Sequence, residues 1–218
     1  SASGLAAVWA EHNTREEIFA AFKRREVYAT SGPRIILQLY AGWLFPEGAE
    51  TSNDFSNIGS EYGVPMGGEL VATSEAQNSI SILISAIKDP KGANLDRVQI
   101  VKGWIDEQSQ LHEKVYDVAW SGDRETNDNG KLSPVTNTVD LKSGRYENSV
   151  GDESFTVKWI DPDFNVSQKS FYYARVLEIP TPRNTLFDSI ALQLDGPPRG
   201  AKIIQERAYS SPIWYHPK

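Results

Sequence analysis

The hydrophobic period of the chain changes once, at Gly32-Pro33, and this change constrains the fold more than any other feature. Residues 14–32 predict one helix that leads directly into one strand. Beyond Pro33 apolar residues recur at every second position, as they do in strands with one buried face. Because a single helix–strand unit cannot bury its own faces, we expect residues 1–33 to be the tail of a larger α/β body.

The predicted helix has a clear start and an apolar side. Thr14 and Glu17 form a capping box, in which the threonine hydroxyl accepts a hydrogen bond from the backbone N–H three residues later. Ile18, Phe19 and Phe22 lie on one side of the helix. Its last turn is basic, which the helix dipole favours. A strand is expected to follow over residues 26–31.

Beyond Pro33 the chain predicts an antiparallel β-sandwich or a jelly-roll-like fold. Alternation of apolar and polar residues is clearest over residues 79–86, 154–159 and 171–176. Turn-forming residues separate these short segments, as in sandwiches. The Gly-, Ser- and Asn-rich run 46–63 is expected to form a long loop. Further strands are expected at 34–44, 67–72, 96–105, 113–120 and 201–208.

The composition argues against several classes of protein. A formal charge of −7 and a pI near 5.1 argue against nucleic acid or an anionic membrane as partner, since both require a basic face. The chain has no cysteine, which excludes disulfides, a thiol nucleophile and a zinc–thiolate site. No apolar run reaches the roughly 18 residues of a membrane span. The compartment stays open, because a periplasmic or secreted location would need a signal peptide upstream.

The sequence shows no complete metal site. Catalytic sites use several His or carboxylate ligands, often two close together, whereas the histidines here stand apart, at His12, His112 and His216. The segment 161–165 (DPDFN) resembles the start of a calcium loop, but Val166 and Tyr172 replace the Gly and Glu of its sixth and twelfth positions. We interpret this segment as an Asx-rich turn. No catalytic, cofactor-binding or metal-binding residue is therefore assigned.

The tryptophans suggest an alternative function. Exposed rings would form a large apolar patch on which sugars stack, and would make the chain a carbohydrate-binding or cell-surface-polymer-binding module. Most of the rings alternate with Val and Ile, as core aromatics do, which favours a structural role. The six are Trp9, Trp43, Trp104, Trp120, Trp159 and Trp214.

Five segments resemble a known group of enzymes. Residues 6–16 (AAVWAEHNTRE) and 25–35 (REVYATSGPRI) are similar to the end of the barrel in PHP-type metallohydrolases, the polymerase-and-histidinol-phosphatase superfamily. The resemblance is to a large bacterial branch, the domain-of-unknown-function family 3604. Residues 88–104 (KDPKGANLDRVQIVKGW), 171–183 (FYYARVLEIPTPR) and 205–215 (QERAYSSPIWY) resemble the same branch. The likeness therefore covers most of the chain.

This resemblance implies that a longer protein would carry an N-terminal PHP barrel with two or three divalent metals (Zn, Mn or Fe). Such barrels hydrolyse phosphoesters or related bonds by activating water on the metals. Their His-x-His and Asp-x-His ligands have no match in this sequence, so none is carried over. The resemblance implies that this chain is an ancillary, non-catalytic β domain of a metal-dependent hydrolase.

One hypothesis concerns the end of the strand over 26–31. In related α/β barrels the C-terminal ends of the strands face the active site. Thr30, Ser31 and Arg34 lie at that end, and the hypothesis places them at the rim of the barrel site. The alternative is a plain turn that leaves the barrel, with Arg34 in a surface ion pair.

We therefore expect two parts, the helix–strand tail of a PHP-like barrel over residues 1–33 and a β-sandwich over residues 34–218. The expected partner is the barrel of the same protein, which would contact an apolar surface of this chain. Without the barrel, that surface should make the chain self-associate or contact a partner chain. Neither the substrate nor the metal of the parent enzyme follows from these residues.

Overall fold

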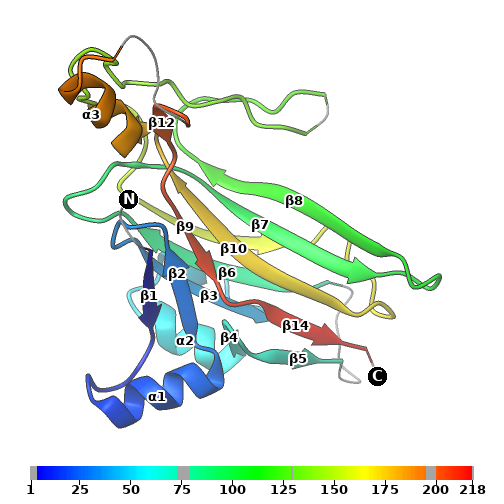
Figure 1. Ribbon diagram of the computed structural model, residues 1–218. Helices are drawn as coiled ribbons and strands as arrows, with labels where there is room; N and C mark the ends of the chain where they lie inside the picture. The colour runs from blue at the N-terminus through cyan, green and yellow to red at the C-terminus, as the bar shows by residue number, and fades with distance from the viewer. Residues whose placement is uncertain (1–3, 73–78, 129, 195–199, 218) are drawn as a thin grey trace.

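Two large β-sheets that share one hydrophobic core form the body of the described structure, as the period-two alternation predicts (Figure 1). The computed structural model describes residues 4–72, 79–128, 130–194 and 200–217. The larger sheet has eight strands: β1 (Leu5–Val8), β2 (Val27–Thr30), β5 (Glu69–Val71), β7 (Leu95–Ile105), β8 (Leu111–Trp120), β10 (Ser170–Glu178), β13 (Arg207–Ser210) and β14 (Ile213–His216). The smaller sheet has four: β3 (Ile36–Gly42), β4 (Gly63–Pro65), β6 (Ser81–Ile87) and β9 (Ser154–Ile160).

Strand β10 is the centre of the larger sheet. It pairs antiparallel with β7 along one edge, and β7 pairs in turn with β8. Along its other edge lie β13 and then β14, which are separated by Ser211-Pro212. Beyond β13 the sheet continues to β2 and β1, and beyond β14 it ends in β5, which runs parallel to β14. All other pairs among the described strands are antiparallel.

The core lies between the two sheets because one face of each strand is apolar. In β10 every second residue is buried, from Ser170 to Glu178. This alternation places Tyr172 and Ala174 on the inner face of the sheet, and Phe171 and Tyr173 on the outer face, as predicted. The inner residues of the smaller sheet that meet them include Leu37, Leu39, Ile82, Ile84 and Ala86.

The first helix confirms the predicted capping box in part. Helix α1 (Arg15–Arg24) begins at Thr14, whose Oγ1 accepts a hydrogen bond from the N–H of Glu17 at 3.3 Å. Ala21 is buried, whereas Phe19 and Phe22 are 60% and 48% exposed. The predicted apolar side of the helix is therefore turned away from the core.

Strands β1 and β2, which flank α1, run antiparallel to each other. Strand β2 then pairs with β13, so residues 5–30 are continuous with the larger sheet. Consecutive strands of a barrel built from βαβ units run parallel instead. The antiparallel pairing of β1 and β2 is thus not the arrangement of such a barrel. That residues 1–33 form the tail of a barrel in a longer protein stays a prediction.

The expectation of a long loop over residues 46–63 is wrong. This run contains a short 3₁₀ turn (Ala49–Thr51) and helix α2 (Phe55–Tyr62), which cover the outer face of the smaller sheet. Phe55 and Ile58 pack there against Tyr40. The glycine and asparagine content hid this amphipathic pattern.

The remaining strand predictions are confirmed with small shifts of boundary. Segments 34–44, 67–72, 96–105 and 113–120 contain β3, β5, β7 and β8. Segment 201–208 is divided instead, between β12 (Ile203–Ile204) and the start of β13. Strand β12 pairs with β11 (Thr181–Pro182), and helix α3 (Asn184–Ala191), which was not predicted, follows β11. None of the described helices is long and apolar enough to cross a bilayer.

Candidate functional site

The predicted rim residues lie at one end of the larger sheet, where β2 meets β13. The backbone N–H of Ser31 donates to the carbonyl of Arg207 at 2.9 Å, and the N–H of Arg207 donates to Ser31 Oγ at 2.8 Å. The same hydroxyl donates to the carboxylate of Glu206. Thr30 is buried beside it, and its hydroxyl accepts from the N–H of the next residue but one. Thr30 and Ser31 therefore share one hydrogen-bonded turn.

Arg34 does not join this turn. Its side chain is exposed, and its backbone N–H donates to Asp89 Oδ2 at 2.8 Å. Among the described residues its guanidinium forms no ion pair. Whether the three residues border a barrel site stays a prediction.

A buried carboxyl group, Glu178, lies next to this turn at the end of β10. The N–H of Glu178 donates to the carbonyl of Glu206 at 2.9 Å, and the side chain is almost fully enclosed, with 1% of the residue exposed. Burial, followed by the negative charges of Glu206 and Asp89, raises the pKa of Glu178 to about 8. The carboxyl group is therefore largely protonated at neutral pH.

An ionic cluster beside Glu178 is centred on Asp96, which is fully buried. Its carboxylate forms ion pairs with Arg97 at 3.0 Å and with Arg124 at 2.7 Å. The amide of Gln205 donates both to Asp96 Oδ2 and to the carbonyl of Glu178, each at 2.9 Å. The cluster thus ties β7, β10 and the segment before β13 together, and two arginines compensate one buried charge.

The three histidines do not converge on a metal site. His12 is exposed before α1, His112 bonds Asp106 at 2.7 Å, and His216 lies 3.8 Å from Glu69. Within the described part of the chain no three His, Cys, Asp or Glu side chains are placed to hold a metal ion. The described residues of this chain therefore offer no site for the metals that the resemblance places in the barrel, and we derive no chemical step through a metal here.

The segment 161–165 forms the predicted Asx turn, in which the N–H of Asp163 donates to Asp161 Oδ1 at 2.9 Å. The carboxylate of Asp161 is buried and accepts from Lys102 Nζ at 2.6 Å and from the hydroxyl of Tyr172 at 2.7 Å. Lys102 is itself 2% exposed. An ammonium group therefore occupies the position that a calcium ion would need, and the pair joins the two sheets.

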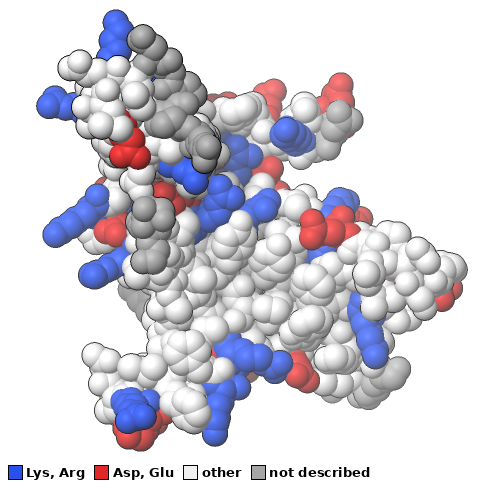
Figure 2. Space-filling view, in the orientation of Figure 1, with Lys and Arg blue, Asp and Glu red and all other residues white. Residues whose placement is uncertain are grey.

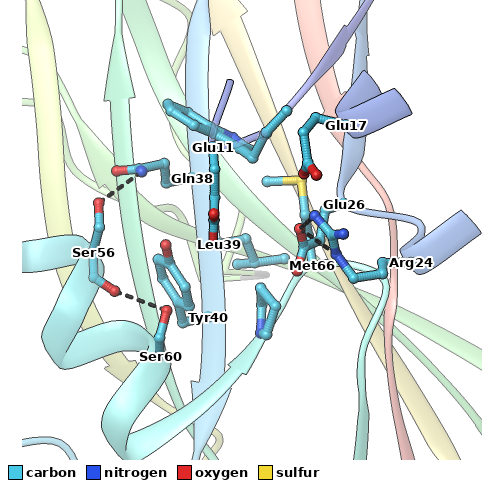
Figure 3. A pocket seen from close by; sticks show the side chains of 13 residues that line it. Glu11, Glu17, Arg24, Glu26, Gln38, Leu39, Tyr40, Ser56, Ser60 and Met66 are labelled. Atoms are coloured by element: carbon cyan, nitrogen blue, oxygen red, sulfur yellow. Dashed lines mark hydrogen bonds and ion pairs between the residues drawn. The ribbon is translucent and has the colours of Figure 1, made fainter. Parts of the chain in front are cut away.

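A polar pocket lies at the joint between the predicted tail and the β-domain (Figure 3). Arg24 donates to the carboxylate of Glu26 through Nε and Nη2, at 3.0 and 2.9 Å. Across the pocket, Gln38 donates to Ser56 Oγ at 2.9 Å. Figure 3 shows Glu17 on the same side as the Arg24–Glu26 pair. Since Glu26 already compensates Arg24, the pocket keeps a negative character and does not attract anions.

The outer face of the larger sheet carries a row of aromatic side chains. Phe171 lies 5.1 Å from Trp214 and 6.4 Å from Tyr173, measured between ring centroids, and Tyr173 lies 6.3 Å from Tyr209. Trp214 is 38% exposed, and the other three are half-buried. Figure 2 shows this face as an uncharged zone over β10 and β14, with Lys and Arg side chains gathered above it. We call these four residues the aromatic row.

The prediction that most of the tryptophans are core residues is confirmed for three of them. Trp9, Trp43 and Trp159 pack against the shared core. Trp9 also donates from its indole nitrogen to the carbonyl of Leu37 at 2.9 Å. Trp214 differs from these three because it lies on the outer face of the larger sheet.

Comparison with known families assigns the chain to a family. The family described as "Protein of unknown function (DUF3604)" matches residues 1–217. The chain belongs to this family. No curated protein and no solved structure matches the chain. The resemblance to family 3604 is thus confirmed, whereas the wider link to PHP-type enzymes belongs to the proposal below.

In this DUF3604 chain the structure brings two of the three predicted rim residues together, Thr30 and Ser31, and leaves Arg34 apart. Sequence reasoning missed Glu178 and Glu206, because they reach the turn from positions about 150 and 175 residues farther along the chain. The one available signal was the charge of Glu178 in a strand segment whose neighbouring residues, Leu177 and Ile179, are apolar.

Proposed function

We propose that this chain is an ancillary β domain of a larger, PHP-like metal-dependent hydrolase of the phosphoesterase type. In this proposal it packs against the catalytic barrel of the same protein and is not the catalytic unit. The resemblance of residues 6–16 and 25–35 to the end of PHP barrels supports the link to the superfamily. A jelly-roll-like arrangement of the two sheets, and a role for residues 1–33 as the last part of the barrel, belong to the same proposal.

The exposed aromatic side of α1 is the observation that carries this proposal. Phe19 and Phe22 lie one turn apart and are 60% and 48% exposed, and Ile18 borders the same shallow groove. Large apolar side chains gathered at one place on a surface mark a contact with another body. Full burial of each phenylalanine would contribute roughly 1.5–3 kcal/mol. Figure 1 shows α1 at the margin of the molecule, beside β1 and β2 of the larger sheet.

The occupant that we assign to this side is the barrel, because α1 lies between the two segments, 6–16 and 25–35, that resemble the barrel end. When the barrel is absent, two copies of the chain can cover the side for each other. Analytical ultracentrifugation of the chain over a range of concentrations tests this. We expect the weight-average mass to rise above that of one chain, and the variant Phe19→Glu with Phe22→Glu to remain monomeric.

A matched control is Leu44→Glu with Leu192→Glu, since both leucines are exposed and lie outside α1. It adds the same charge and should associate like the unchanged chain. A mass of one chain at the highest concentration, or equal loss of association in the control, would overturn the docking role of α1.

A second candidate function is a binding module for a carbohydrate or a cell-surface polymer. The observation that favours it is the aromatic row, in which Trp214 is exposed and three further rings continue across the sheet. This candidate uses a different surface from the docking role, so one chain can serve both.

A further inference from the structure

Two arginines on the outer face of the larger sheet are held by neutral partners. Arg175 donates from Nε to the side-chain oxygen of Gln99 at 2.7 Å. Arg207 donates from Nε and Nη2 to the carbonyl of Gln205, at 3.1 and 3.0 Å. Among the described residues neither arginine forms an ion pair with a carboxylate. Each therefore keeps an uncompensated positive charge in a fixed orientation.

Gln99 is the residue that orients Arg175. Its amide nitrogen donates to Asp117 Oδ1 at 2.7 Å, which fixes the amide so that its oxygen faces Arg175. Asp117 Oδ1 also forms an ion pair with Arg97 Nη1 at 3.5 Å, so that arginine compensates its negative charge. The second guanidinium edge of Arg175 is left for a ligand.

The sheet register brings these cations together. Leu177 of β10 lies opposite Arg97 on one side and Arg207 on the other, and Arg175 lies two residues along the same strand. A hollow of about 390 Å³ is lined by Arg97, Arg175, Arg207 and Lys131, and no Asp or Glu is among its lining residues. This size is within the range of small-molecule sites. We call it the arginine hollow.

The aromatic row begins beside the arginine hollow. Tyr209 lies opposite Arg175 in the register of β10 with β13, and the row continues through Tyr173 and Phe171 to Trp214. In Figure 2 the uncharged zone is bordered above by Lys and Arg side chains, with Asp and Glu side chains between some of them. The outer face therefore combines a cationic end with a longer apolar track.

We propose that this face binds an acidic polysaccharide, with a carboxylate or sulfate group in the arginine hollow and the following sugar rings on the aromatic row. Guanidinium groups bind planar or tetrahedral anions through paired hydrogen bonds. The apolar faces of sugar rings are suited to contact with aromatic side chains. The inference rests on the second proposed function and not on the docking role of α1, so its failure leaves that role untouched.

The charge of the molecule favours a polysaccharide over a nucleic acid. A nucleic acid presents a continuous line of phosphates and requires a broad basic surface. This chain has a net charge of −7, and the cluster of cations on this face lies at one end of the track. A single lysine, Lys169, lies beside Phe171 and Trp214 at the other end. A polymer with spaced charges and uncharged ring faces fits that distribution better.

Isothermal titration of the whole chain with three polymers tests the proposal. Polygalacturonate supplies carboxylates, dextran sulfate supplies sulfates, and neutral dextran supplies rings without charge. We expect at least one acidic polymer to bind about tenfold or more tightly than neutral dextran, and added salt to weaken that binding. The stronger of the two acidic polymers identifies the anion.

The variant Arg175→Gln with Arg207→Gln should lose about tenfold or more in affinity, as expected for the loss of charge-assisted hydrogen bonds. The matched control, Arg15→Gln with Lys91→Gln, removes the same charge from exposed residues outside the hollow and should bind like the unchanged chain. Trp214→Ala should also weaken binding. Circular dichroism of each variant shows that the fold is retained.

Three outcomes would overturn the proposal. The first is that neither acidic polymer binds more tightly than neutral dextran. The second is that the control variant loses as much affinity as the arginine variant, which would indicate an effect of net charge alone. A single-stranded oligonucleotide that binds as tightly as the acidic polymers, with the same loss in the arginine variant, would reassign the face to nucleic acid.

Discussion

At the scale of single residues, Glu178 makes the stability of the protein depend on pH. Its carboxyl group is buried at the end of β10, and its pKa is raised to about 8 from a usual value of 4.5, first by burial and then by Glu206 and Asp89. As the pH rises from about 4.5 to 8, the unfolded chain loses this proton while the folded chain keeps it. The contribution of Glu178 to stability is therefore full below the unfolded pKa and is lost as pH rises through the folded pKa.

Replacement of Glu178 by Gln should remove this dependence. The amide keeps the shape of the neutral acid and cannot ionise, so the free energy of unfolding should exceed that of the unchanged chain by on the order of 5 kcal/mol at pH 9 and equal it near pH 4. Urea unfolding across this pH range measures both. Glu113→Gln, at an exposed position, should follow the unchanged chain. Parallel curves for Glu178→Gln and the unchanged chain would show that Glu178 ionises freely in the folded state.

The residues of the candidate site could be predicted only in part. Thr30 and Ser31 were placed at a strand end, and the structure confirms that strand end. Their contacts with Glu206 and Arg207 come from about 175 residues away, and periodicity along the chain carries no information on such pairs. The orientation of Arg175 by Gln99 likewise depends on the register of β7 with β10.

At the scale of elements, α2 shows how packing can override composition. Gly59 lies in the middle of this helix, where glycine costs about 1 kcal/mol relative to alanine. A Cβ at this position would lie 2.5 Å from the ring of Tyr40, so the close approach of the helix to β3 requires glycine. Gly59 is also one of the residues whose type led to the prediction of a loop for this segment.

The substitution Gly59→Ala should therefore destabilise the protein although alanine favours helices. We expect the overlap with Tyr40 to cost about 1–3 kcal/mol in the free energy of unfolding, more than the gain in helix propensity. Ser60→Ala, at the next and exposed position, should change stability by no more than about 0.5 kcal/mol. Urea unfolding decides the question, and a more stable Gly59→Ala chain would show that the Tyr40 ring moves aside freely.

Strands were easier to predict than helices in this chain. The long alternating segments of β6, β9 and β10 follow from period two, because one face of each is buried in the shared core. Helix α3 was missed, since eight residues give only two turns of helical pattern. The division between β13 and β14 follows from Pro212, which cannot donate to the ladder.

At the scale of the whole molecule, the protein presents two different surfaces to its surroundings. The aromatic side of α1 is compact and suits contact with another folded body. The aromatic row and the arginine hollow form an extended track across the larger sheet. The antiparallel sheets hold both surfaces in place. An ancillary domain that binds another body and a ligand would need such a rigid support.

The central claim is that this chain serves a hydrolase without being its catalytic unit, and its metal content tests that claim most directly. The purified chain is dialysed with Zn, Mn and Fe and then against metal-free buffer, and elemental mass spectrometry follows. We predict less than about a tenth of an equivalent of each metal, since a preformed site would retain its metal through dialysis. A stoichiometric metal would mean that His and carboxylate side chains converge in solution, and would contradict the ancillary role.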